Sequence, residues 1–228
     1  MQFFKDITHI FFPNICSCCD NVLTSNEITV CTQCIYDLPL TNYTLENSDF
    51  VKKVFYGRIQ LEQATALFLY QKKGIVQNLI HNLKYRGHQE IGIFIGKWLG
   101  QEMKKSNNYE DIDYIIPVPL HKKRFKERGY NQLTQFGKQL SKELEIKYLE
   151  NILVRKTTSR TQTKKIRTER WKNVIELFYL VDLSIFENKH ILLIDDIITT
   201  GATLESCSTE LLKTKNLKIS IAVMAITV

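Results

Sequence analysis

Proline and glycine are both scarce in this chain, which has four prolines and nine glycines among its 228 residues. This scarcity excludes collagen-like repeats and long Gly/Pro-rich linkers. No apolar run approaches the roughly 20 residues that a membrane-spanning helix needs, so we expect no membrane span. The N-terminal stretch MQFFKDITHIFFPN is interrupted by Lys5, Asp6 and His9, which argues against a signal peptide and favours a cytoplasmic protein. Apolar residues make up 44% of the chain, enough for the packed core of one domain with a small appendage.

Acidic residues are few in one part of the chain, and the charge is therefore unevenly distributed. Between His121 and Lys172 there are 16 Lys and Arg against 5 Asp and Glu, a local balance of +11 in a chain of formal net charge +7. The remainder is net negative. This basic segment is either a solvated face or a surface for phosphate-bearing ligands, small or polymeric.

Cysteines are concentrated near the N-terminus, where five of the six lie within the first 34 residues. Two CxxC pairs, eleven residues apart, are formed by Cys16, Cys19, Cys31 and Cys34. Four thiolates in this spacing are typical of a structural Zn²⁺ site, which would stabilise a module too small for a core of its own. The alternative is a set of reduced thiols without metal. Cys18 lies outside the symmetric spacing and is left out, although it could replace a neighbouring ligand.

The pattern of apolar residues predicts strands alternating with helices, which is typical of an α/β fold with a parallel sheet flanked by helices. We expect a cysteine module at 1–40, a linker and helical or hood segment at 41–111, and the sheet domain at 112–228. Strands are expected at 64–70, 113–120, 152–156, 190–196 and 217–228, and helices at 75–85, 90–105, 131–144 and 202–215. Residues 157–173 are polar and basic and are expected to form a mobile loop. Cys207, alone on the last helix, is expected to be a small buried apolar residue.

Three glycines, Gly92, Gly96 and Gly100, are spaced four apart in the second expected helix and share one of its faces. The spacing would permit close packing of this helix against a neighbouring element, or it is simply a poor helical sequence.

Two adjacent aspartates, Asp195 and Asp196, follow the buried run ILLI and precede the turn ITTGAT. In parallel α/β sheets, ligands bind beyond the carboxyl ends of the strands. The start of the next helix offers free amides to a phosphate, Gly201 lets the backbone approach it, and carboxylates accept hydrogen bonds from sugar hydroxyls. A ribose 5-phosphate satisfies both halves of this pattern. The strand also resembles the Mg²⁺-binding strand of P-loop proteins, but no GxxxxGK[ST] loop is present. The same residues could also form a response-regulator-type acidic site or a plain helix cap.

The segment ILLIDDIITTGAT resembles the phosphoribosyl pyrophosphate (PRPP) signature of type I phosphoribosyltransferases over all thirteen positions. The whole chain resembles the competence protein F (ComF) family, through the cysteine pairs, NLKYRGH, IIPVPLHKKRFKERGYNQ, and TQ followed by RWKN. Lys165 departs from this pattern, since an apolar residue is expected there. The resemblance implies a type I phosphoribosyltransferase-like sheet with an N-terminal zinc-binding module.

The family resemblance also implies roles for individual residues. Asp195 and Asp196 would be the catalytic pair that holds the ribose hydroxyls. The groups expected to bind the phosphate and pyrophosphate of PRPP are Ile198, Thr199, Thr200, Gly201, Ala202, Thr203, His121, Lys122, Lys123, Arg124, Arg128, Gln162 and Arg170. Mg²⁺ would bind together with PRPP, and a nitrogen acceptor would displace pyrophosphate at C1. No general base is evident, and the acceptor would be chosen within 41–111.

A second function remains open, because ComF relatives are associated with DNA uptake. The chain would then be a non-catalytic accessory protein that binds single-stranded DNA or a protein of the competence machinery. Tyr85, Phe125 and Tyr130 lie beside basic residues and could stack on bases. We favour core positions for these three aromatic residues.

Overall fold

The computed structural model describes residues 13–155, 178–180 and 184–227. Its centre is a five-stranded sheet with the order β1-β7-β6-β2-β3, in which every neighbouring pair is parallel. The strands are β1 (Ala64–Tyr70), β2 (Tyr114–Pro117), β3 (Lys147–Tyr148), β6 (His190–Ile198) and β7 (Lys218–Thr227). The helices are α2 (Thr32–Asp37), α3 (Phe50–Lys53), α4 (Ile75–Tyr85), α5 (Glu90–Ser106), α6 (Lys122–Arg128), α7 (Thr134–Leu144) and α8 (Ala202–Leu211), with a 3₁₀ turn at Ser184–Phe186.

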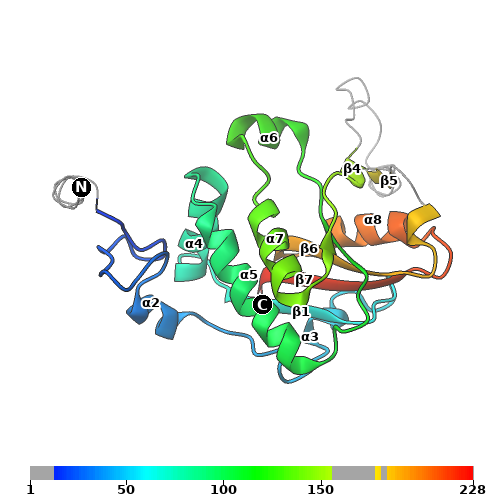
Figure 1. Ribbon diagram of the computed structural model, residues 1–228, viewed down its shortest axis with the longest axis horizontal. Coiled ribbons are helices and arrows are strands. Elements are labelled where there is room, and N and C mark those ends of the chain that lie inside the picture. The colour runs from blue at the N-terminus through cyan, green and yellow to red at the C-terminus, as the bar shows by residue number, and fades with distance from the viewer. Residues whose placement is uncertain (1–12, 156–177, 181–183, 228) are drawn as a thin grey trace.

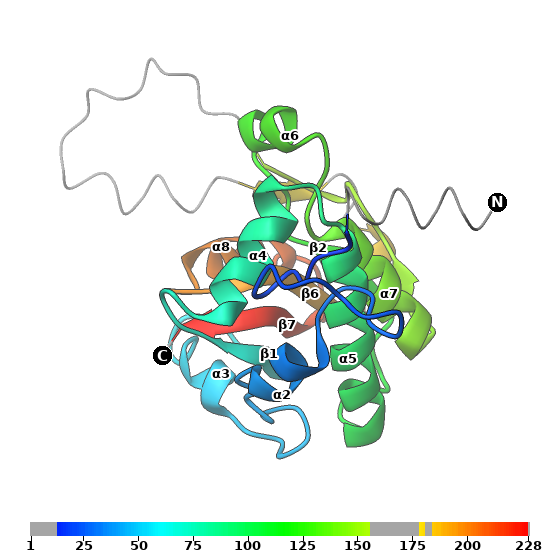
Figure 2. The same cartoon turned by 90° about the vertical axis from the view of Figure 1, so that its left-hand side faces the viewer.

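Helices cover both faces of the sheet, which explains the continuous apolar runs of its two central strands. Residues 191–194 of β6 and 219–226 of β7 are all buried. The crossovers from β2 to β3 and from β6 to β7 run in opposite directions across the sheet, so right-handed connections place α7 and α8 on opposite faces. Figure 2 shows α5 and α7 on one side, with α8 and α3 on the other. The expected parallel sheet flanked by helices is confirmed.

The three glycines of α5 are where that helix meets α7. A Cβ atom added at Gly96 would lie 2.8 Å from the Phe136 carbonyl oxygen, and one at Gly92 would lie 3.0 Å from the Phe136 amide nitrogen. At Gly100 it would lie 2.7 Å from Glu143 Cβ. The expectation of close packing along this face is therefore confirmed, and the partner is a helix.

Some expected elements differ from the observed ones. The strand expected at 152–156 is not part of the parallel sheet: β4 (Leu153–Arg155) pairs antiparallel with β5 (Phe178–Leu180) in a separate two-stranded sheet. β6 continues two residues beyond Asp196, because β7 still pairs with it as far as Ile198. β1 lies in the segment expected to be linker and hood, so the boundary expected at residue 112 passes through the sheet. The expected loop at 157–173 lies outside the described residues.

The cysteine module lies at one end of the molecule, beside α4 (Figure 1). Two asparagine side chains of α4 fasten it: Asn78 Nδ2 donates to the Cys18 carbonyl at 3.0 Å, and Asn82 Nδ2 donates to the Ser17 carbonyl at 2.9 Å. Asn82 is buried. Because both carbonyls lie between Cys16 and Cys19, α4 holds the first cysteine pair directly.

Within the described part of the chain, none of the helices is both long enough and apolar enough to cross a membrane.

Candidate functional site

The loop between β6 and α8 forms a small pocket at the carboxyl end of the sheet. Its volume is about 40 Å³, and it is lined by Asp195, Ile197 and residues 199–204. Thr199 and Thr200 are exposed, whereas Gly201 is buried and has a φ of +76°. The first turn of a helix leaves backbone amides without helical partners, and the helix dipole adds positive potential there. The pocket therefore combines hydroxyl and amide donors suited to a phosphate group.

Ile198 contributes differently from its neighbours in the loop. Its side chain is only 1% exposed, and its carbonyl accepts a hydrogen bond from Thr227 Oγ1 at 3.2 Å. Ile198 thus fixes the end of β6 in the core, and its side chain cannot reach a ligand.

The two aspartates point to opposite faces of β6, as successive strand residues do. Asp195 lines the loop pocket, and its Oδ1 accepts a hydrogen bond from the Asp196 amide at 2.8 Å. Burial and the neighbouring Asp196 carboxylate raise the pKa of Asp195, while Lys84 and Arg124 partly offset this rise. Asp195 is thus the one of the two aspartates that faces the loop pocket.

Asp196 is held by protein partners on both of its carboxylate oxygens. Lys84 Nζ lies 2.8 Å from Oδ1, and Gln132 Nε2 donates to Oδ2 at 2.8 Å. Asp196 is 8% exposed. This differs from the pair of open carboxylates expected from the sequence: a sugar hydroxyl would have to share these oxygens with Lys84 and Gln132, or displace them.

Sequence reasoning missed Lys84 and Gln132 as site residues, although both lie in segments that carry the family resemblance, NLKYRGH and ERGYNQ. A chain of contacts extends from them to the basic helix α6. Arg128 Nη1 donates to Gln132 Oε1 at 2.7 Å, and the Arg128 guanidinium lies 5.0 Å from the centre of the Tyr85 ring. Arg128 therefore reaches Asp196 through Gln132.

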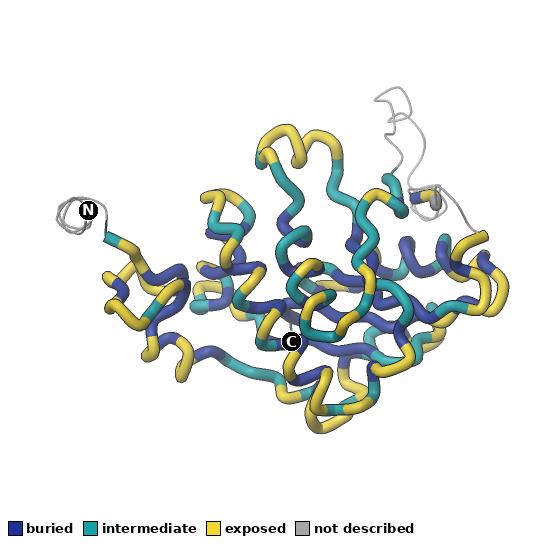
Figure 3. Tube along the Cα trace, viewed as in Figure 1, coloured by how far each residue is buried: buried dark blue, intermediate teal, exposed yellow. Residues whose placement is uncertain are grey.

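The other basic residues expected near pyrophosphate lie on or beside α6, which projects from the body of the protein and is largely exposed (Figures 1 and 3). His121 caps this helix, its Nδ1 accepting from the Lys123 amide at 3.1 Å. Lys123 Nζ lies 3.8 Å from Glu127 Oε1. Lys122 lines a separate pocket of about 350 Å³ between the end of β2, α6 and β4. These residues follow the carboxyl end of β2 in the chain, while Gln162 and Arg170 lie outside the described residues.

The expectation that the aromatic residues beside these basic groups belong to the core is wrong for two of the three. Tyr85 is 64% exposed and Phe125 is 50% exposed. Tyr130 is half-buried, and its hydroxyl donates to the Leu83 carbonyl. Phe125 is on α6, a short projecting helix that exposes part of every face, and Tyr85 is the last residue of α4.

The four expected metal ligands lie together. The Sγ atoms of Cys16, Cys19, Cys31 and Cys34 all lie within 4.8 Å of one another. The Cys19–Cys31 Sγ distance is 3.8 Å, which fits the edge of a tetrahedron with metal–sulfur bonds of about 2.3 Å. Amides of Cys18 and Cys31 donate to Cys16 Sγ. The cluster could bind a metal such as zinc; Cys18 is outside it, and Cys207 is fully buried on α8 as expected.

A known family matches the part of the chain that contains the loop pocket. Residues 134–226 match the phosphoribosyl transferase domain family. Competence protein F of Haemophilus influenzae is 37% identical over 109 residues, which cover 47% of this chain and 48% of that protein, so the match spans about half of each. DNA utilization protein YhgH of Shigella flexneri is 27% identical over 205 residues, covering 87% of this chain and 84% of that protein. A solved structure of glutamine PRPP amidotransferase from B. subtilis, complexed with ADP and GMP, covers 63% of this chain and 30% of its own at 17% identity and a TM-score of 0.44.

Proposed function

We propose that this chain, which belongs to the competence protein F (ComF) family of the type I phosphoribosyltransferase superfamily, binds PRPP or another ligand containing ribose 5-phosphate. The observation that supports this most directly is the loop pocket, where hydroxyls and helix-terminal amides meet the Asp195 carboxylate. Such a site offers donors to a phosphate and an acceptor to sugar hydroxyls.

Different residues of the site would bind different parts of the proposed ligand. Thr199, Thr200 and Thr203 would hold the 5-phosphate together with the Gly201 amide and the Ala202 amide, which would exchange its bond to Thr200 Oγ1 for one to the phosphate. Asp195 would accept from a ribose hydroxyl. Asp196 lies on the opposite face of β6, paired with Lys84 and Gln132, and would contact the sugar only by sharing its oxygens with them or displacing them. The basic residues around the end of β2, with Arg124 and Arg128, would face the pyrophosphate.

We propose that the reaction transfers the phosphoribosyl group of PRPP to a nitrogen acceptor. The C1–pyrophosphate oxygen bond breaks, a C1–nitrogen bond forms, and the pyrophosphate leaves with the electron pair. The acceptor nitrogen loses its proton to solvent. The side chains of α6 would stabilise the charge of the leaving group, and the loop would position the sugar. Bound Mg²⁺ would neutralise pyrophosphate charge, and Asp195, which lines the loop pocket, would supply it with a carboxylate ligand after losing its proton.

We also propose that the four-cysteine cluster holds a structural Zn²⁺. Four thiolates within tetrahedral reach are the donor set that structural zinc sites use, and the module around them has few other means of stabilisation. Reducing conditions such as those of the cytoplasm, the proposed location, would keep these thiols available to the metal. Metal analysis of the purified protein should give one zinc per chain, and a value far below one would reject the proposal.

Ligand-induced stabilisation tests the proposed PRPP site. Titration with PRPP and Mg²⁺ should raise the melting temperature of the unaltered protein, because a ligand that binds only the folded state stabilises it. Asp195→Asn should reduce this rise while the variant still folds. Asp37→Asn, at an exposed position on α2, is the matched control and should respond like the unaltered protein. No shift with the unaltered protein would reject PRPP binding.

A second candidate function is supported by the exposed aromatic residues. Phe125 and Tyr85 are largely exposed among the basic residues of α6 and the end of α4, an arrangement that could engage single-stranded DNA by stacking and phosphate contact. We propose that binding of single-stranded DNA is the accessory role of this chain in DNA uptake, a role that the names of the relatives also suggest. A protein of the competence machinery is the alternative partner. Binding of a single-stranded oligonucleotide should weaken steeply with salt, and Phe125→Ala should reduce it. A flat salt response or unchanged binding by Phe125→Ala would reject this role.

A further inference from the structure

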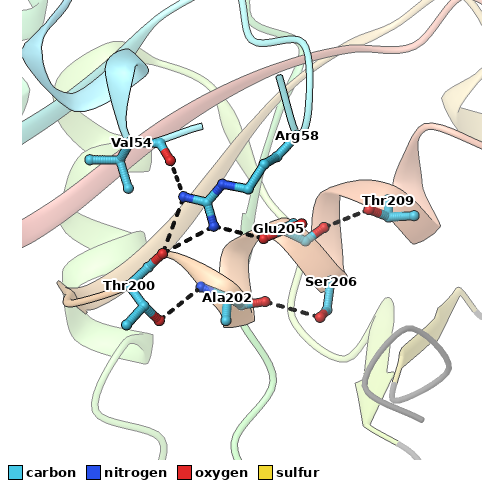
Figure 4. A network of polar contacts seen from close by, with 7 residues as sticks. All are labelled: Val54, Arg58, Thr200, Ala202, Glu205, Ser206 and Thr209. Carbon is cyan, nitrogen blue, oxygen red and sulfur yellow. Dashed lines mark hydrogen bonds and ion pairs between the residues drawn. The ribbon is translucent and has the colours of Figure 1, made fainter. Parts of the chain in front are cut away.

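The segment from Phe50 to Arg58 lies directly against the loop between β6 and α8, although it is far from that loop in sequence. Residues 199–203 of this loop are called the phosphate loop below. Figure 4 shows the Arg58 guanidinium between this segment and the start of α8. Both of its terminal nitrogens donate to the Thr200 carbonyl at 3.2 Å, and Nη1 donates to Glu205 Oε2 at 2.8 Å. Nη2 also donates to the Val54 carbonyl. One side chain thus connects its own segment to the loop and to the first turn of α8.

Packing reinforces this polar connection on the adjacent residue of the loop. A Cβ atom at Gly201 would lie 2.8 Å from Phe55 Cε1 and 3.2 Å from Val54 Cγ1. Phe55 is fully buried, and the Arg58 guanidinium lies 5.5 Å from the centre of its ring. The loop backbone therefore rests on a fixed apolar surface, with Arg58 closing one edge of it.

The Thr200 carbonyl and the Glu205 carboxylate, which both accept from Arg58, each affect how the loop would bind an anion. Holding the Thr200 carbonyl on the Arg58 side fixes the peptide plane that carries the Gly201 amide, and with it the direction of the amides that follow. Glu205 lies in the first turn of α8, where its negative charge would repel a phosphate bound at the same helix start. Arg58 neutralises that charge with a direct ion pair.

We propose that Arg58 is a positioning residue for the phosphate loop: it holds residues 199–203 in the conformation that receives a phosphate monoester. Arg58 touches no ligand in this role and acts through Thr200 and Glu205. The inference rests on the proposed function for its effect on affinity, but its effect on the loop can be measured without ligand.

Three variants separate the contributions. Arg58→Met keeps a long unbranched side chain but removes every donor. Arg58→Lys keeps the charge but cannot present two nitrogens to one carbonyl. Glu205→Gln removes the acid and leaves the Thr200 contact in place. Lys53→Met, at an exposed lysine of α3 in the same segment, is the matched control for loss of one positive charge.

The readouts are hydrogen exchange of a peptide covering residues 198–204 in the unliganded protein and calorimetric titration with ribose 5-phosphate. Arg58→Met should speed exchange in this peptide and weaken ribose 5-phosphate binding roughly three- to tenfold, in the range of exposed ion pairs and charged hydrogen bonds. Arg58→Lys should recover part of the affinity but little of the protection. Glu205→Gln and Lys53→Met should leave the protection unchanged.

Two results would overturn the proposal. Unchanged exchange in Arg58→Met would show that the loop does not need Arg58. Full recovery of both readouts in the double variant Arg58→Met, Glu205→Gln would show that Arg58 only neutralises Glu205. If Arg58→Met loosens the loop but the unaltered protein binds neither ribose 5-phosphate nor PRPP with Mg²⁺, the positioning role stands and the proposed function is rejected.

Discussion

At the scale of single residues, two chemically identical neighbours have different environments. Asp196 is paired with Lys84, whereas Asp195 faces the loop pocket with one oxygen bonded only to a backbone amide. An acid kept without a cation of its own beside a second acid is a cost to folding, and such costs are common where a ligand binds. We therefore expect Asp195 to be the residue of the site whose substitution changes the free energy of unfolding in a pH-dependent way.

The pH dependence of stability should reveal the state of Asp195. Burial and Asp196 raise its pKa from 3.8 to about 8, so between these values the folded state retains a proton that the unfolded state has lost. The free energy of unfolding then falls as pH rises through this window. Asp195→Asn removes this effect, and its melting temperature relative to the unaltered protein should climb between pH 4.5 and 8, by about 2–4 °C for each kcal/mol. A difference that stays constant with pH would mean that Asp195 ionises normally.

The Lys84–Asp196 pair gives a second test at this scale. The two side chains are 16% and 11% exposed, so Lys84→Met would leave a largely buried carboxylate without its cation. We expect a loss of roughly 2–4 kcal/mol in denaturant unfolding, somewhat below the range for fully buried pairs. The double variant Lys84→Met, Asp196→Asn should recover most of it. Lys97→Met, at an exposed position of α5, should change stability by less than about 0.5 kcal/mol. Equal losses in the two Lys84 variants would contradict the pairing.

A feature of the site could be predicted from the sequence when its residues lie close together along the chain. The aspartates and the glycine turn lie within nine residues, so one short stretch carries their geometry, and the sequence predicted their proximity. Arg58 meets Glu205 across 147 positions, and Lys84 meets Asp196 across 112. No spacing rule relates residues so distant, and only the folded sheet brings them together.

At the scale of elements, the glycine face of α5 determines how closely that helix approaches α7. A methyl group at Gly96 would meet the backbone oxygen of Phe136 at 2.8 Å, and backbone cannot move aside as a flexible side chain can. Gly96→Ala gains about 1 kcal/mol of helix propensity but forces the helices apart, which costs about 1–3 kcal/mol. Denaturant unfolding should show a net loss of stability. Gln101→Ala, on an exposed position of the same helix, should be neutral or slightly stabilising, and a stabilised Gly96→Ala would contradict tight packing.

The long elements were predictable and the short ones were not, for a physical reason. α4, α5 and β7 carry a complete apolar pattern because each buries a whole face in the core. α3 has four residues and β3 has two, too few for a period to be seen. β4 carries the apolar residues of a strand, but its sequence does not indicate which strand it pairs with. Its antiparallel partner β5 lies 23 or more residues further along the chain. Pattern thus indicated the type of element, while pairing depended on the rest of the fold.

At the scale of the whole molecule, α4 joins the cysteine module to the candidate site. Asn78 and Asn82 hold the carbonyls of Cys18 and Ser17, and Lys84, on the last turn of the same helix, holds Asp196. A helix is stiff over this length, so a disturbance at the module should be felt at Lys84.

Metal removal from the full chain tests that coupling. Chelation of the proposed zinc, or Cys34→Ser, should unfold the module locally, because metal binding and folding are one process in small cysteine modules. Amide exchange at the end of α4 should then rise, and affinity for ribose 5-phosphate should fall a few-fold, since Lys84 would hold Asp196 less firmly. Asn82→Ala, with the metal retained, should reproduce the change in α4 to a smaller extent, whereas Gln33→Ala on the exposed side of α2 should not. If chelation exposes the module yet leaves exchange in α4 unchanged, the module and the site are independent, and α4 only happens to touch both.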